Sequence, residues 1–170
     1  ALDIVSYFNN KSLSKNKSID LKIYDGKIFP FGNKIFDVII SNDTFEHLRF
    51  PECVIRECNR VLKKNGLLIT QIDLRDHYNL DDEKNIFECL KYSKKLWEMM
   101  TINRTSYVNR LRFSDWKKLF SNINFEIKYI NFEKNEYIKK NYRQINYLTN
   151  FNEDDACIQR LNCVLEKIND

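Results

Sequence analysis

Apolar stretches recur along the chain, and their periods predict strands that alternate with helices. Residues 36–41 form a continuous apolar run, which is typical of a strand in a parallel sheet covered on both faces. Residues 67–72 form a second run, and alternating apolar and polar positions predict three further strands. These lie at 19–24, 125–129 and 161–165, and a short apolar segment at 1–5 fits the end of one more strand.

A helix is predicted from Pro51, because proline suits a first helical turn and Glu52 complements the helix dipole. Its apolar side chains fall on one face, at Val54, Ile55, Cys58, Val61 and Leu62. Two lysines and Gly66 are expected to end it.

A second long helix is expected over about 81–101, capped by Asp81 or Asp82. Ser114 is expected to cap a short helix that ends near Phe120. Segment 133–159 shows no clear period. Buried strands that alternate with helices predict an α/β fold with a mostly parallel sheet.

Acids or amides follow four of the predicted strands, at Asp3, Asp25, Asn42–Asp43 and Asp73. Ligands of such sheets bind beyond the carboxyl ends of the strands. An acid after a strand can accept ribose hydroxyls, and an acid followed by glycine, such as Asp25, can accept an exocyclic amine. This set predicts an adenosine site.

Composition narrows the class of protein. The 28 basic and 24 acidic residues are interspersed, so the net charge of +4 is too diffuse to predict nucleic-acid binding. No apolar run is long enough for a membrane span, and a soluble, cytoplasmic protein is expected. The five cysteines form no Cys-x-x-Cys pair, and with two histidines the spacing predicts no metal site. Most of the cysteines are expected to be core residues.

One block has a recognisable order of motifs: DGKIFPFGNKIFDVIISNDTFEHLRFPECVIRECNRVLKKNGLLI. It resembles the central block of class I S-adenosylmethionine-dependent methyltransferases, in which Asp and a small residue precede Pro-Phe, Phe-Asp-x-Val, Glu-His and Glu-x-x-Arg-Val-Leu-Lys. The resemblance implies a Rossmann-like sheet with helices on both faces and a reversed final strand. QIDLRDHY and NRLRFSDW resemble, more weakly, enzymes that act on glycans or small metabolites.

The resemblance also implies roles in holding S-adenosylmethionine. Asp3 matches the acid that holds the ribose, and Asp25 matches the acceptor of the adenine amine. Gly26 and Ile28 would lie against the adenine ring. Ser41 and Asn42 match the strand end beneath the methyl group.

The sequence departs from the family at one point, because no Gly-x-Gly loop is present and the three glycines stand elsewhere. We expect a single domain over residues 1–170, with a helical insertion at about 81–101. It is expected to be N-terminally truncated, without the first strand and helix of the fold.

Polar residues near the strand ends are candidates for chemistry. His77, oriented by Asp73 across a turn, is a candidate general base, and His47 is either a second catalytic group or a residue that ties the loop. Arg110 and Arg112 could bind an anionic acceptor or serve as ion-paired surface residues. Tyr92 and Trp97 could cover the acceptor or pack the helix.

The predicted function is methyl transfer from S-adenosylmethionine to oxygen or nitrogen of a small molecule or glycan. One alternative is a catalytically silent methyltransferase-like module that serves as a binding or scaffold domain. Another is a nicotinamide-dependent oxidoreductase, against which Asp25–Gly26 and the Glu-His pair argue.

Overall fold

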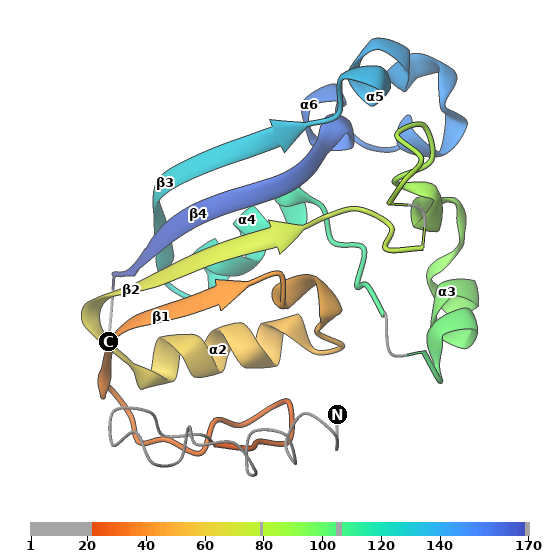
Figure 1. The fold of residues 1–170 in the computed structure, drawn as a ribbon. Coiled ribbons are helices and arrows are strands. Elements are labelled where there is room, and N and C mark those ends of the chain that lie inside the picture. The colour runs from red at the N-terminus through yellow and green to blue at the C-terminus, as the bar shows by residue number, and fades with distance from the viewer. Residues whose placement is uncertain (1–21, 79, 105–106, 169–170) are drawn as a thin grey trace.

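A computed structural model describes residues 22–78, 80–104 and 107–168. Its centre is a four-stranded sheet in the order β1-β2-β4-β3 (Figure 1). The strands are β1 (Phe36–Asn42), β2 (Leu62–Asp73), β3 (Phe125–Lys134) and β4 (Ile158–Lys167). β1 and β2 are parallel, and β4 is antiparallel to both of its neighbours, β2 and β3. Three strands therefore run one way and the last is reversed, as the resemblance implied.

Two helices cover one face of this sheet. In α2 (Pro51–Val61), Val54, Ile55 and Cys58 are buried, and in α4 (Phe113–Asn122), Trp116 and Phe120 are buried. These side chains share one core with residues that stand on the same side of the paired strands. Those strand residues are Ile39, Leu68, Ile72, Leu161, Cys163, Leu165, Ile127 and Phe132.

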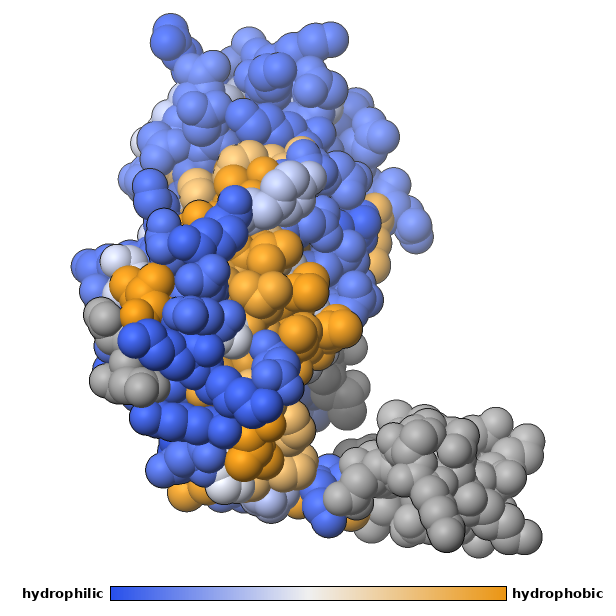
Figure 2. All heavy atoms as spheres, turned by 90° about the vertical axis from the view of Figure 1, so that its left-hand side faces the viewer, coloured by the Kyte–Doolittle hydropathy of each residue, from blue (hydrophilic) through white to orange (hydrophobic). Residues whose placement is uncertain are grey.

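The opposite face is uncovered in the described part of the chain. Ile40 is 75% exposed and Tyr129 is 58% exposed, although both lie within strands. Figure 2 shows hydrophobic side chains gathered in a band over this side of the molecule. The sequence predicted that β1 is covered on both faces, with helices on each side of the sheet. Among the described residues, helices cover only one of these faces.

The remaining elements lie beyond the strand ends. η2 (Phe45–His47) follows β1 directly. Between β2 and α4 lie η3 (Glu88–Lys91) and α3 (Lys94–Thr101). Between β3 and β4 lie α5 (Glu136–Asn141), η4 (Tyr142–Gln144), η5 (Asn146–Leu148) and α6 (Glu153–Cys157). In Figure 1, the strands β1 and β2 point towards the side on which α3 lies.

The first predicted helix is correct at its start and wrong at its end. The α2 helix stops at Val61, and the chain enters β2 at Leu62 rather than at residue 67. Gly66 lies inside β2 instead of capping the helix. An added Cβ there would lie 2.9 Å from the backbone oxygen of Lys63 and 3.2 Å from that of Asp37, so close approach of the backbones requires glycine.

The long helix expected over 81–101 is replaced by turns, η3 and the shorter α3. Asp82 caps a turn, since its carboxylate accepts from the backbone N–H of Lys84 and from the side chain of Asn85. Ser93 caps α3 instead, with its Oγ accepting from Leu96 N. Short polar side chains at both positions can cap a helix, and the sequence does not say which one does.

Other expectations fall partly outside the described residues. The predicted strand at 1–5 lies outside them, and of 19–24 only residues 22–24 are described, where no strand forms. The last two predicted strands are confirmed and extend further, as β3 and β4. Four of the five cysteines are buried, and Cys53 is exposed.

Arg112 joins the segments at the carboxyl end of β2 to the sheet. Its side chain is fully buried and donates to the carbonyls of Leu74, Asp155 and Ile158. The guanidinium carbon also lies 4.3 Å from the centroid of the Phe87 ring. One side chain thus links the end of β2, α6 and the start of β4.

We predict that Arg112→Met lowers the free energy of unfolding by about 3 to 5 kcal/mol, because three buried carbonyls lose their donor. Urea unfolding followed by circular dichroism measures the change. Lys118→Met, at an exposed position of α4, is the matched control and should change the stability by about 0.5 kcal/mol or less. Equal stability of the two variants would contradict the structural role of Arg112.

Candidate functional site

The carboxyl ends of β1 and β2 form one edge of the sheet. Asn42 is paired with Gln71, and Gln71 Nε2 donates to both carboxylate oxygens of Asp43 at 3.0 Å. Asp43 has a positive φ of 45°, so the chain turns sharply as it leaves β1. Polar groups from both strands therefore meet at this edge.

The turn at Asp25 reaches the same end of the molecule. Asp25 Oδ1 accepts from Lys27 N and Ile28 N, both at 2.8 Å, and these bonds lower the pKa of its carboxyl. Gly26 has a φ of +80°, which glycine adopts without strain. Lys27 Nζ lies 4.8 Å from the centre of the Phe50 ring, directly before α2, so the turn lies near the start of α2.

The Glu-x-x-Arg motif of α2 holds the segment that follows this turn. Arg60 donates to the carbonyls of Phe29 and Phe31 and forms a 2.6 Å ion pair with Glu57. Glu57 also accepts from Phe29 N. The motif therefore has a positioning role, because it fixes the loop between Asp25 and β1.

The other expected cofactor residues are placed unequally. Ile28 is 65% exposed, next to Gly26, so an apolar surface is available beside the Asp25 carboxylate. Asn42 stands at the end of β1, with its amide 3.3 Å from Asp43. Ser41 Oγ is buried without a hydrogen-bond partner among the described residues. Asp3 lies outside the described residues.

Three proton-binding side chains meet beyond the strand ends, and we call them the strand-end cluster: Glu46, His47 and His77. Ligand-type atoms of all three lie within 4.8 Å of one another. The rings of His47 and His77 have centroids 4.8 Å apart. Glu46 and His47 come from η2, whereas His77 comes from the segment after β2.

Asp73 is engaged by arginines rather than by His77. Arg75 and Arg160 both bind its carboxylate, at 2.6 Å and 3.2 Å. Burial alone would raise the pKa of Asp73, but the hydrogen bonds from Arg75 lower it. His77 Nε2 lies 3.9 Å from Asp73 Oδ2, beyond hydrogen-bond distance. The expected orientation of His77 by Asp73 is therefore not made through a hydrogen bond here.

Burial shifts the pKa values of two members of the strand-end cluster, Glu46 and His77. The pKa of Glu46 rises to about 7, first because the carboxyl is desolvated and then because Asp43 and Asp73 lie near. Desolvation lowers the pKa of His77, and His47 adds to this effect. Both groups are held closer to their neutral forms than they would be in water.

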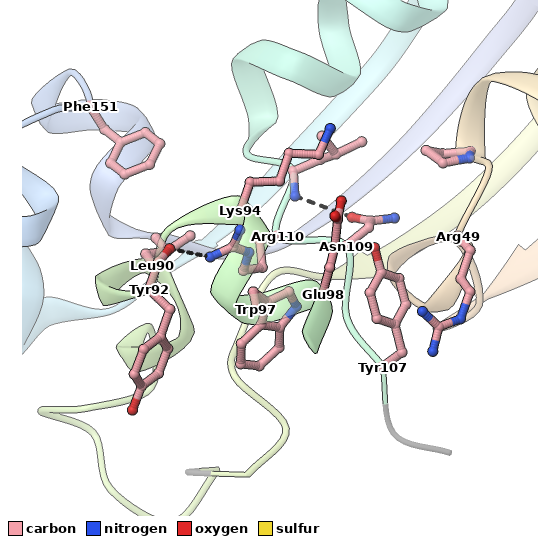
Figure 3. A pocket seen from close by; sticks show the side chains of 12 residues that line it. Arg49, Leu90, Tyr92, Lys94, Trp97, Glu98, Tyr107, Asn109, Arg110 and Phe151 are labelled. Carbon is pink, nitrogen blue, oxygen red and sulfur yellow. Dashed lines mark hydrogen bonds between the residues drawn. The ribbon is translucent and has the colours of Figure 1, made fainter. Parts of the chain in front are cut away.

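A cavity of about 450 Å³ lies beside this edge, between α3 and the start of α2. Figure 3 shows Tyr92 and Trp97 on one side of it, and Tyr107 and Arg49 on the other. Lys94 and Arg110 also line it. Its lining carries three cationic side chains and one acidic side chain, Glu98.

The structure separates the two arginines that the sequence proposed for acceptor binding. Arg110 lines the cavity, with its guanidinium carbon 5.3 Å from the centre of the Trp97 ring, and it donates to the carbonyls of Cys89 and Tyr92. Arg112 does not reach the cavity, since backbone carbonyls surround its buried guanidinium. The expected substrate-binding role of Arg112 is corrected to a structural one.

Sequence reasoning missed Arg49, Glu46 and Asn109. Asn109 donates through its amide to the carbonyls of Phe45 and Leu48, and its backbone N–H donates to Glu46 O. It thereby fixes the turn that carries Glu46 and His47. No local signal marks such a residue, because its partners lie about sixty positions away in the sequence.

The known proteins that this chain resembles share one fold. The family model described as "Methyltransferase domain" matches residues 1–70. A Bacillus halodurans protein with a provisional methyltransferase assignment is 16% identical, with a TM-score of 0.55 over 86% of this chain and 70% of its own. A SAM-dependent methyltransferase from Methanosarcina mazei is 14% identical, with a TM-score of 0.56 over 88% of this chain and 67% of its own.

The [4+2]-cyclase SpnF is also similar, at 13% identity and a TM-score of 0.54 over 99% of this chain and 61% of its own. The chain thus spans about two thirds of the length of these structures. No curated protein matches it. The fold implied by the resemblance in the sequence is confirmed: the chain has the fold of class I S-adenosylmethionine-dependent methyltransferases.

The raised pKa of Glu46 predicts a pH-dependent stability. The carboxyl group of Glu46 binds its proton more tightly in the folded state than in the unfolded chain. Glu46 therefore stabilises the fold fully below its ordinary pKa of 4.5, and this stabilisation is lost as the pH rises through about 7. The free energy of unfolding of the wild type should therefore fall by about 3 kcal/mol between about pH 5 and pH 8 because of Glu46. Glu46→Gln should lack that loss.

Urea unfolding at the two pH values, with a chelator present, measures the difference between the proteins. Glu52→Gln, an exposed acid of α2, is the control and should follow wild type. If Glu46→Gln shows the same pH dependence as wild type, the carboxyl is not held neutral by burial.

Proposed function

We propose that this chain is part of an enzyme that transfers a methyl group from S-adenosylmethionine to oxygen or nitrogen of a small molecule or glycan. One observation carries the proposal: the Asp25–Ile28 turn, the end of β1 and the strand-end cluster lie at one end of a methyltransferase fold. Methyl transfer to a protonated acceptor needs a site for the cofactor and a group that takes up the proton, both at the same strand ends.

The residues present fit the adenosine end of the cofactor. Asp25 Oδ1 is used by the turn, which leaves Oδ2 to accept the adenine amine. Gly26 has no Cβ to obstruct the approach of the ring, and nothing lies within 4 Å of the place where a Cβ would stand. Ile28 offers an exposed apolar surface beside it. Ser41 and Asn42 would lie beneath the reacting end.

The cavity beside α3 suits the acceptor. A volume of about 450 Å³ lies within the range of small-molecule sites, which is about 300 to 1,000 Å³. Arg49, Lys94 and Arg110 favour an acceptor with a carboxylate or phosphate. Tyr92 and Trp97, which stack at 6.2 Å, offer an aromatic wall for its apolar body or a sugar ring.

The strand-end cluster is the proposed destination of the acceptor proton. When bound, the cofactor supplies a methyl group that its sulfonium has already activated, so alignment of the acceptor and exclusion of water are the main tasks of the protein. A hydroxyl acceptor must also lose a proton. The strand-end cluster would receive this proton. It includes His77 Nε2, which is buried and has no hydrogen-bond partner among the described residues.

The positioning role of Arg60 gives a test of the cofactor site. Arg60→Ala removes the bonds that hold the carbonyls of Phe29 and Phe31, so the turn at Asp25 loses its support. We expect the dissociation constant of S-adenosylhomocysteine to rise about tenfold, measured by isothermal titration calorimetry. Arg56→Ala is the matched control on the same helix, since Arg56 pairs only with exposed Glu52 among the interactions seen.

No binding of S-adenosylhomocysteine to wild type would overturn the proposed cofactor. Binding that both variants retain unchanged would place the cofactor elsewhere. Circular dichroism of each variant confirms that the fold is kept.

The charge of the cavity gives a test of the acceptor site. We predict that Lys94→Glu raises the KM for an anionic acceptor at least about tenfold, because it replaces attraction by repulsion. Lys95→Glu makes the same change on the adjacent residue, which does not line the cavity, and should leave the KM within about twofold of wild type. Transfer of radiolabelled methyl to a panel of carboxylated and phosphorylated small molecules and glycans supplies the rates.

An equal rise in both variants would show a general effect of charge and not a site. If Lys94→Glu keeps its affinity for S-adenosylhomocysteine, the substitution affects binding of the acceptor and not of the cofactor.

A catalytically silent binding module is the second candidate. The three glycines form no Gly-x-Gly loop, and a similar fold occurs in the [4+2]-cyclase SpnF. Such a module would show no transfer to any member of the acceptor panel, whether or not it bound S-adenosylhomocysteine. Measured methyl transfer would exclude it.

A further inference from the structure

The strand-end cluster contains a buried carboxylate that forms no ion pair with an arginine or lysine among the described residues. Glu46 is 2% exposed, and neither of its carboxylate oxygens has a hydrogen-bond partner in the described part of the chain. The other acids buried near the strand ends differ. Asp73 binds Arg75 and Arg160, Asp76 accepts from Tyr78 N, and Asp155 accepts from Ser114. Burying an unpaired charge is costly, so this carboxylate requires a partner of positive charge or a proton.

One ring nitrogen of His47 is held by a backbone carbonyl. His47 Nδ1 lies 2.7 Å from the carbonyl oxygen of Tyr107, so Nδ1 carries the proton and donates it. The lone pair is then on His47 Nε2, which lies 4.0 Å from Glu46 Oε1. A ring N–H bound to a backbone carbonyl is the usual support of a histidine that ligates a metal.

His77 supplies the third group. Its Nε2 is buried and has no hydrogen-bond partner among the described residues. The plane of its ring makes an angle of 69° with that of His47, and the two ring centroids lie 4.8 Å apart. Thirty residues separate them in the sequence, which is why their spacing predicted no metal site.

We propose that Glu46, His47 and His77 bind a divalent transition-metal cation such as Zn²⁺, Co²⁺, Mn²⁺ or Fe²⁺. Two imidazoles and one carboxylate suit these ions, and three protein ligands leave an open position for water or another oxygen ligand. In a tetrahedral site, ligand atoms lie roughly 3.4 Å apart. The present separations, up to 4.8 Å, therefore require the ligand atoms to approach one another by up to about 1.4 Å when the ion binds.

The surrounding charges favour a cation at this point. A second carboxylate borders the cluster, since Asp73 Oδ2 lies 3.9 Å from His77 Nε2. Arg75 and Arg160 are held by Asp73 and offset that carboxylate rather than Glu46. The site goes beyond the proposed methyl transfer, because binding of the ion needs neither cofactor nor acceptor.

The test uses Co²⁺ alone with the chelator-treated 170-residue protein. We expect binding of one ion per chain by calorimetry, with visible absorption bands typical of a four- or five-coordinate ion. The chain has only two histidines, so its proton NMR spectrum offers a direct assignment of the ligands. The ring signals of both should shift or broaden together as Co²⁺ is added.

Matched variants assign the ion to the cluster. Glu46→Gln keeps the shape of the side chain, and His77→Gln removes one imidazole; each should weaken binding of Co²⁺ at least about tenfold. Glu52→Gln and Cys53→Ser remove an exposed carboxylate and the exposed thiol near the start of α2, and both should bind as wild type does.

The proposal is overturned if wild type binds no ion at millimolar Co²⁺, or if binding leaves either histidine signal unchanged. Binding that survives Glu46→Gln and His77→Gln, or that is lost in Cys53→Ser, overturns it as well. The wild-type NMR result decides the matter even if a variant fails to fold. None of these outcomes involves S-adenosylmethionine, so they are independent of the result for methyl transfer.

Discussion

The buried guanidinium of Arg112 is the interaction on which the arrangement of the strand ends depends. It donates to carbonyls from three segments, after β2, within α6 and at the start of β4. It also precedes α4, whose aromatic side chains fill the core beneath the sheet. A charge with this many backbone acceptors tolerates burial, whereas an apolar side chain would leave the acceptors unpaired. The long connections at this end of the sheet are thereby held in one arrangement.

The segment at residues 107–111 couples the two halves of the candidate site. Tyr107 and Arg110 line the cavity beside α3, and the Tyr107 carbonyl accepts from His47. Asn109, between them, binds the turn that carries Glu46. Occupancy of the cavity and the geometry of the strand-end cluster therefore depend on the same few residues. Trp97 reinforces this link, since its indole N–H donates to the Val108 carbonyl from within α3.

Much of the fold could be predicted because it follows from local periods. The strands β1, β3 and β4 and the start of α2 were identified from apolar spacing, and the Glu-His and Glu-x-x-Arg motifs marked the end of β1 and the loop beside it. The end of α2 was misplaced because Lys63, Asn65 and Gly66 also suit a bend inside a strand. Segment 81–101 was predicted as one helix, but Ser93 starts α3 late and Asp82 caps a turn.

The sequence by itself determined the class of fold, the edge of the sheet at which polar groups gather and the turn at Asp25. These features rest on backbone periods and on side chains that bond within a few positions of themselves. Only the tertiary structure decided the roles of the charged residues. Arg110 and Arg112 differ by two positions, yet one lines a cavity and the other is buried among carbonyls. Likewise, Glu46 meets His77 only because β1 and β2 are neighbours, since a charged side chain acts on whatever the fold places within a few ångströms of it.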